Sequence, residues 1–162
     1  TMTSRTPERI VIDFLDALAR GDSAAAMADV AENIVYSNVG LPTIRGKRGV
    51  AKIFGAMDKA SYAGFDYRMI SIATDDTVVL TERIDEIRLG RVRIRFWVCG
   101  RFEVVDGAIV VWRDYFDFLD CTKATVRGLI GVVVPSAVRA LPPRRERVVS
   151  AVAEPSSKAA TE

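Results

Sequence analysis

The chain has 162 residues, 49% of them hydrophobic and 27% charged, which is the composition of an ordinary globular protein at the length of one domain. Its net charge of +2 and its scattered arginines lack the basic footprint of a nucleic-acid-binding protein, and no apolar run approaches the ~20 residues of a membrane span. The absence of histidine excludes Ser-His-Asp and Cys-His catalysis, so acid–base chemistry must use Asp, Glu, Lys, Tyr or Cys. No hydrophobic signal segment opens the sequence, which predicts a cytoplasmic protein.

The N-terminal part of the sequence predicts three helices and one strand. Thr6, followed by a proline, is typical of a helix N-terminus, and Gly21 ends the apolar pattern that follows. Alternation over 33–40 predicts a strand with Tyr36 and Asn38 on one face. The predicted elements are a helix over 7–20, a short helix over 24–31, the strand over 33–40 and a helix within 44–60 whose apolar face carries Val50, Ile53, Phe54 and Met57.

From Phe65 onward the hydrophobic period is two, which predicts a run of antiparallel strands. The predicted elements are strands over 65–74, 77–89, 91–104 and 108–118, and a last helix over 120–133. Helices followed by long strands predict a single α+β domain over 1–143, and the composition beyond it predicts a flexible tail over 144–162. Cys99 and Cys121 do not make a disulfide framework and are expected to pack as small buried or half-buried apolar residues.

The segment "IVVWRDYFDFLD" at 109–120 places one carboxylate on an otherwise apolar strand face. Alternation assigns to this face Val110, Trp112, Asp114, Phe116 and Phe118. An ionised carboxylate in apolar surroundings costs several kcal/mol unless another group compensates it. Asp114 is therefore expected to have a cationic partner or an altered pKa.

A candidate partner lies in "TERIDEI" at 81–87, where Arg83 and Asp85 share one strand face with Ile87. A guanidinium can hold two carboxylates at once, so Arg83 is placed to lie between Asp85 and Asp114. A buried pair of acids with one cation is expected to share a proton, which provides a general acid and a general base without histidine. Tyr36 and Asn38 can add a hydroxyl and an amide to hold a water. A solvated surface ion pair and a structural hydrogen-bonding Asp are the alternatives.

Three segments together resemble the limonene-1,2-epoxide hydrolase family: "YSN" at 36–38, "ERID" at 82–85 and "WRDYFD" at 112–117. The resemblance covers roughly residues 5–135, and the sequence looks similar to actinobacterial, especially mycobacterial, members. It implies a cone-shaped, curved mixed β-sheet packed on N-terminal helices, the fold shared with ketosteroid isomerases and polyketide cyclases. It also implies a homodimer that needs no metal or organic cofactor.

The resemblance assigns a role to each polar residue. Asp114 would be the base that takes a proton from water, and Tyr36 and Asn38 would hold that water. Asp85 would protonate the epoxide oxygen, and Arg83 would bridge the two aspartates. The implied reaction is a one-step concerted addition of water that gives a vicinal diol.

The substrate is expected to be an apolar epoxide of terpene, lipid or sterol type, which would suit a role in lipid detoxification. Four residues are candidate pocket walls, with a plain core role as the alternative: Ile87, Val98, Trp112 and Phe116. An isomerase or cyclase on the same fold is a rival function, although it needs neither the bridging Arg83 nor a held water. A non-catalytic module that binds apolar ligands would keep the pocket without requiring both aspartates.

Overall fold

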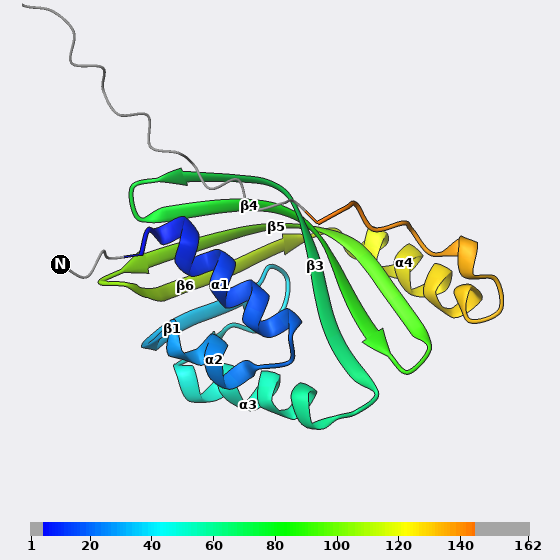
Figure 1. Cartoon of the computed structure of the whole chain (residues 1–162), viewed down its shortest axis with the longest axis horizontal. Coiled ribbons are helices and arrows are strands. Elements are labelled where there is room, and N and C mark those ends of the chain that lie inside the picture. The colour runs from blue at the N-terminus through cyan, green and yellow to red at the C-terminus, as the bar shows by residue number, and fades with distance from the viewer. Residues whose placement is uncertain (1–4, 145–162) are drawn as a thin grey trace, which may run out of the picture.

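The computed structural model describes residues 5–144 as a curved, mixed six-stranded sheet with helices on its inner face (Figure 1). The helices and strands are α1 (Pro7–Ala19), α2 (Ser23–Ala28), β1 (Val30–Asn38), β2 (Ile44–Arg45), α3 (Lys47–Lys59), β3 (Ala63–Asp75), β4 (Val78–Leu89), β5 (Val92–Val105), β6 (Ala108–Phe116), α4 (Phe118–Gly131) and the short 3-10 helix η1 (Pro135–Ala137). The predicted α+β class is confirmed.

The strand order in the sheet is β2-β1-β6-β5-β4-β3. All neighbours are antiparallel except β1 and β6, which run parallel. The turn between β5 and β6 is the predicted Asp-Gly hairpin, and both Asp106 and Gly107 have positive φ, as a type I′ turn requires. The parallel pair is important for the site because it brings the end of β1 beside the end of β6.

The core lies between the sheet and helices α1, α2 and α3, which Figure 1 shows in front of the sheet. Phe14 of α1 meets the ring of Trp112 edge-on at 5.0 Å, and Tyr36 stacks on the same indole at 4.2 Å. Phe54 of α3 and Phe102 of β5 complete this aromatic cluster around Trp112. Each of these rings buries a large apolar area, so the cluster is a main source of the stability of the inner face.

Helix α4 covers an edge of β5 that has no strand beside it. The pairing of β5 with β6 begins at Val98, so the first half of β5 would expose unpaired backbone groups on that side. The Trp97 N–H donates to the Asp120 carboxylate at 2.9 Å, and Gly128 lies against the Arg93 carbonyl. Because Gly128 has no side chain, α4 can approach β5 closely at this contact.

The outer face of the sheet carries a buried carboxylate of its own. Glu86 accepts from Arg95 at 2.6 Å and from Arg93 at 3.2 Å, and it is only 2% exposed. The segment after α4 crosses this face, where the Arg139 carbonyl accepts from Arg95 at 2.6 Å. On the outer face of β4, the Glu86 carboxylate is therefore paired with two arginines, and Arg95 also binds a backbone carbonyl.

Several predicted boundaries differ from the structure. The strand predicted over 108–118 ends at Phe116, and Phe118 begins α4 because Asp117 caps this helix through the Asp120 N–H at 2.7 Å. Phe118 therefore does not share the strand face of Asp114. The other differences are that α2 ends at Ala28, that β1 begins at Val30, that β2 was not predicted, and that Ile53 and Cys99 are exposed.

The domain boundary after residue 143 and the tail over 144–162 stay predictions. All of that tail except Arg144 lies outside the described residues. Arg144 itself donates to the Asp66 carboxylate at 3.0 Å.

Candidate active site

Arg83 joins the two predicted aspartates on the inner face of the sheet. Its Nε and Nη2 atoms donate to the two oxygens of Asp85, each at 3.0 Å, and Nη2 also donates to Asp114 Oδ2 at 3.0 Å. Asp85 lies two residues along β4, whereas Asp114 lies on β6, with β5 between them. The guanidinium therefore crosses the middle strand to bridge carboxylates that are 29 residues apart in sequence.

This group of charges is removed from solvent. Arg83 is 0% exposed, and Asp85 and Asp114 are each 5% exposed. Burial raises the pKa of Asp114 above its ordinary value; the Arg83 cation lowers it and the nearby Asp85 raises it. Burial acts to lower the pKa of Arg83, but the charges of Asp114 and Asp85 outweigh it and raise this pKa above its usual range. The three side chains thus form one buried unit in which a carboxyl keeps a proton to higher pH than usual.

Tyr36 and Asn38 lie beside Asp114 because β1 runs parallel to β6. The register pairs Tyr36 with Trp112 and Asn38 with Asp114. Asn38 Nδ2 donates to the Tyr36 hydroxyl at 2.8 Å, which leaves the hydroxyl hydrogen free to be donated to another group. Burial raises the pKa of Tyr36 to about 12, so the phenol stays protonated at neutral pH. One Asp114 oxygen, Oδ1, has no hydrogen-bond partner within residues 5–144.

The four predicted pocket residues fall into two groups. Val98 is buried on the inner face, and Ile87 and Phe116 are half-buried on the strands that carry the aspartates. Trp112 instead lies inside the aromatic core, 3% exposed, which favours the core alternative for this residue. Its indole Nε1, like Asp114 Oδ1, has no hydrogen-bond partner within residues 5–144.

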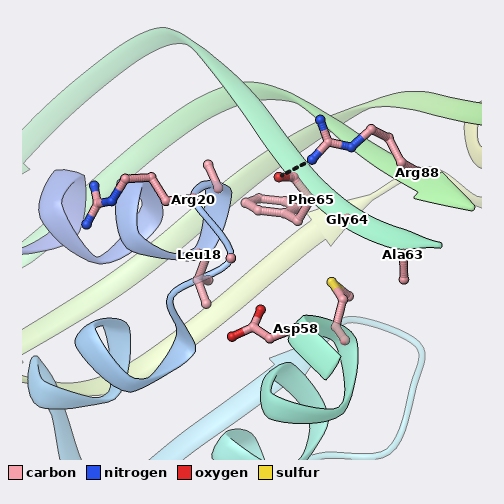
Figure 2. A pocket seen from close by; sticks show the side chains of 10 residues that line it. Leu18, Arg20, Asp58, Ala63, Gly64, Phe65 and Arg88 are labelled. Atoms are coloured by element: carbon pink, nitrogen blue, oxygen red, sulfur yellow. Dashed lines mark hydrogen bonds between the residues drawn. The ribbon is translucent and has the colours of Figure 1, made fainter. Parts of the chain in front are cut away.

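A pocket of about 220 Å³ opens between the C-terminal ends of α1 and α3 and the start of β3. Figure 2 shows Leu18 and Phe65 pointing into it, while the side chains of Arg20 and Arg88 point away. The Arg88 guanidinium donates to the Phe65 carbonyl at 3.5 Å. Neither Asp85 nor Asp114 lines this pocket, so the two buried carboxylates are a separate feature of the inner face.

Two neighbours of Arg83 were missed in the sequence. Thr81 Oγ1 accepts from Arg83 Nη1 at 3.1 Å, and Gly100 lies directly under the guanidinium. The signal for Thr81 was available, since it shares the face of Arg83 two residues along the same strand. Gly100 could not be found without knowing which residue of β5 faces Asp114.

Within residues 5–144, no three Cys, Asp or Glu side chains are grouped so that they could hold a metal ion. None of the helices in the same residues is long and apolar enough to cross a membrane.

The model of the limonene-1,2-epoxide hydrolase catalytic domain family matches residues 5–127. The chain belongs to the limonene-1,2-epoxide hydrolase family. The resemblance predicted from the sequence is therefore confirmed, and all five predicted polar residues lie inside the matched range.

Known members of the limonene-1,2-epoxide hydrolase family agree with this assignment. Epoxide hydrolase EphG of Mycobacterium tuberculosis is 45% identical over 123 residues, which are 76% of this chain and 81% of that protein. The solved structure of an M. tuberculosis LEH-like epoxide hydrolase is 43% identical, with a TM-score of 0.76, and the match covers 80% of this chain and 96% of that one. The enzyme class predicted from the sequence, epoxide hydrolase, is supported by both.

A more distant structure shows the fold alone. A hypothetical protein with a ketosteroid isomerase-like fold from Catenulispora acidiphila, solved in complex with trimethylamine, is 13% identical with a TM-score of 0.64. The match covers 75% of this chain and 95% of that one. The predicted relation of the fold to ketosteroid isomerases is confirmed.

Proposed function

We propose that this protein adds water to an apolar epoxide in one concerted step, with Asp114 as general base and Asp85 as general acid. The observation that carries the proposal is the fully buried Arg83 guanidinium bound to both carboxylates at 3.0 Å. A cation held in this way lets one carboxyl keep a proton while the other ionises, which provides both catalytic forms at the same pH. No other cluster within residues 5–144 offers that combination.

The chemical step balances within this group. A water held by Tyr36, Asn38 and Asp114 attacks an epoxide carbon, and Asp114 takes one of its protons. The epoxide C–O bond breaks, and its electron pair stays on the oxygen, which takes the proton of Asp85. The product is a vicinal diol. Afterwards Asp114 holds a proton and Asp85 does not, so a proton must pass between the two acids before the next turnover.

The water-holding role of β1 is supported by the hydrogen-bond pattern. The Tyr36 hydroxyl already accepts from Asn38, so it is oriented to donate to a water oxygen. Asp114 Oδ1 has no partner in the described residues and can accept from that water. A raised pKa makes ionised Asp114 a stronger base than an ordinary carboxylate, which favours proton removal from water.

Single substitutions of the two aspartates test the assignment. We expect Asp85→Asn and Asp114→Asn each to lower the rate of diol formation from limonene-1,2-epoxide by about 100-fold or more, because each removes one proton-transfer group. Asp66→Asn is the matched control, since Asp66 is also a buried, arginine-paired aspartate but lies on the outer face. Near-normal turnover by either active-site variant would end the proposal.

A single turnover in ¹⁸O-labelled water tests the concerted step separately. Direct attack by water places the label in the diol at the first turnover. An unlabelled first product would mean that the oxygen came from an aspartate through an ester, which contradicts the proposed role of Asp114.

We propose an apolar substrate because the residues near the acids are Ile87, Val98 and Phe116. A turnover panel of small terpene, fatty-acid and sterol epoxides distinguishes the size classes. Faster hydrolysis of small polar epoxides than of every apolar one would refute an apolar wall. The cytoplasmic location and a role in lipid detoxification stay predictions.

We also propose that the protein works as a homodimer that pairs through the outer face of its sheet. The support is a hollow of about 420 Å³ on this face, lined by apolar and polar side chains of β3 to β6. Leu80 is 52% exposed there, and Tyr115 is 44% exposed. Exposed apolar residues that gather on one face are typical of an interaction surface.

Light scattering after size-exclusion chromatography tests the dimer. Leu80→Glu should convert it to a monomer, whereas Tyr62→Glu, at an exposed position before β3, should leave it intact. A wild-type protein that is monomeric at micromolar concentration would contradict the homodimer. A dimer unchanged by Leu80→Glu would contradict the proposed face.

A further inference from the structure

We infer that Gly100 and Thr81 are positioning residues for the reaction, because they provide the space and the hydrogen bond that hold the Arg83 guanidinium between the aspartates. The inference rests on the proposed function, since both residues act through Arg83 and not on the substrate. Neither residue belongs to the predicted catalytic group.

Gly100 is the middle member of a row that crosses three strands. The register of β4 with β5 pairs Thr81 with Gly100, and the register of β5 with β6 pairs Gly100 with Asp114. Adjacent strands lie about 4.8 Å apart, so Arg83 must reach over β5 to meet a carboxylate roughly 10 Å away on β6. A side chain at the middle of this row would occupy the path of the guanidinium.

The local distances show how closely Arg83 approaches Gly100. A Cβ atom at this position would lie 2.5 Å from Arg83 Nη1, 2.8 Å from Asp114 Oδ1 and 2.8 Å from Thr81 Oγ1. All three of these side chains are buried, so none can swing out into solvent. Any larger residue must therefore displace the guanidinium, the Asp114 carboxylate or the Thr81 side chain, and the guanidinium is the nearest of the three.

The backbone conformation at position 100 does not require a glycine. Gly100 lies in the interior of β5, and its φ is outside the left-handed region where glycine is favoured. Glycine in a strand interior weakens the strand, and it often marks a place where another group approaches closely. Here the approaching group is the guanidinium of Arg83.

Thr81 and Phe102 also contact the Arg83 guanidinium. Thr81 Oγ1 accepts from Nη1 at 3.1 Å, and Nη1 is the guanidinium nitrogen that does not bind either aspartate. The Phe102 ring lies beneath the guanidinium carbon at 5.9 Å. Both carboxylates bind the Nε and Nη2 atoms of Arg83, so Thr81 is the side chain that binds the remaining nitrogen, Nη1.

The first test is Gly100→Ala, with Gly64→Ala as the matched control. A Cβ at Gly64, also a strand glycine, would lie 2.6 Å from the Arg88 guanidinium, which is away from both aspartates. We expect Gly100→Ala to lower kcat for limonene-1,2-epoxide by about 100-fold, because displacement of a positioning group by about 1 Å has that effect. We expect Gly64→Ala to keep the wild-type kcat. A folded Gly100→Ala variant with wild-type kcat would overturn the role of Gly100.

The pH profile distinguishes positioning from a general loss of structure. Arg83 lowers the pKa of Asp114, so moving the guanidinium away lets this pKa rise. The acidic limb of the kcat profile should then move to higher pH by about one unit or more. A limb that stays at its wild-type position would mean that Arg83 has not moved, and the inference would be wrong.

The pair Thr81→Val and Thr81→Ser decides the question even if Gly100→Ala does not fold. Valine has nearly the shape of threonine but no hydroxyl, whereas serine keeps the hydroxyl. We expect the valine variant to lose rate and to move the acidic limb upward, and the serine variant to restore both. Equal profiles for the two variants would refute the role of Thr81.

The outcomes also separate this inference from the proposed function. If Asp85→Asn and Asp114→Asn abolish hydrolysis while the Gly100 and Thr81 variants behave as wild type, only the positioning roles fail. If the aspartate variants keep their activity, the proposed function itself fails.

Discussion

Replacing Arg83 tests how much of the fold's stability depends on the buried charges. Arg83→Met keeps most of the side-chain length but removes the charge and the four hydrogen bonds that the guanidinium donates to Asp85, Asp114 and Thr81. Asp85, Asp114 and Thr81 then lose their shared partner inside the protein. Arg83→Lys keeps a charge but cannot reproduce the planar fork that binds two carboxylates.

The magnitude follows from the burial of the group. Removing one partner of a buried ion pair costs about 3–5 kcal/mol, because the remaining charge is left without compensation. For a domain of this size that loss corresponds to a decrease in Tm of about 6–20 °C. The loss should be at the upper end at alkaline pH, because Arg83 serves two carboxylates at once.

The pH dependence has a definite sign. Without the cation, burial and the charge of Asp85 raise the pKa of Asp114 further above its value in the unfolded chain. A group with a raised pKa in the folded state stabilises the fold while it is protonated, and this contribution is lost as the pH rises through that pKa. The stability deficit of Arg83→Met should therefore be smaller at pH near 5 than at pH near 8.

Urea unfolding of the wild type and of Arg83→Met, at pH near 5 and near 8, measures the loss in the free energy of unfolding. Arg95→Met is the control, because Arg95 is also a largely buried arginine on the same sheet but pairs with Glu86 on the outer face. Its loss leaves Arg93 and Arg88 near that carboxylate, so we expect a smaller deficit and normal diol formation. A deficit for Arg83→Met below about 1 kcal/mol, or one that does not change with pH, would refute the reasoning.

Two further outcomes follow from the same geometry. The kcat profile should be bell-shaped, with its acidic limb above the ordinary Asp value of about 3.9, because burial raises the pKa of Asp114; a flat profile in a diol assay where chemistry limits the rate would contradict this. Asp117→Ala should cost about 1 kcal/mol in urea unfolding through loss of the α4 cap, and an unchanged midpoint would show that this cap does not stabilise the helix.

The meeting of Arg83 with Asp85 and Asp114 could be predicted because strand alternation is strict. Residues two apart on a strand share a face, so the sequence placed Arg83 and Asp85 together without any knowledge of the fold. Asp114 needed one further assumption, that the inner faces of β4 and β6 turn to the same side. This assumption is reasonable for a sheet whose apolar face is buried, because shifting either strand by one residue would expose the apolar residues beside Arg83 or Asp114 to water.

The end of β6 could not be found in the same way. The apolar residues up to Phe118 continue the alternation, so the pattern alone extends the strand by two residues too many. The signal against it was Asp117 followed three residues later by Asp120, which is typical of a capped helix N-terminus. Ile53 was misplaced for a related reason: helical spacing selects a broad stripe, but α3 buries only Val50 and Phe54 against the sheet.

The pairing of β1 with β6 had no local signal. These strands are separated by about half the chain, and nothing in "NIVYSNVG" specifies a parallel neighbour. Yet this pairing places Asn38 beside Asp114, and the antiparallel order β4-β5-β6 places Arg83 on the other side of the same carboxylate. The position of Asp114 between a parallel and an antiparallel neighbour is what lets one carboxyl face both a water-holding pair and a cation.

The same arrangement explains how a chain without histidine can contain an acid–base pair. Two carboxylates that meet inside a protein need a cation, and that cation must reach both without bringing solvent with it. An arginine two strands away from Asp114 can do this only if the strand between them has no side chain in the way, and the residue at that point of β5 is Gly100. The chemistry of Asp85 and Asp114 therefore depends on the smallest residue of the middle strand as much as on the charge of Arg83.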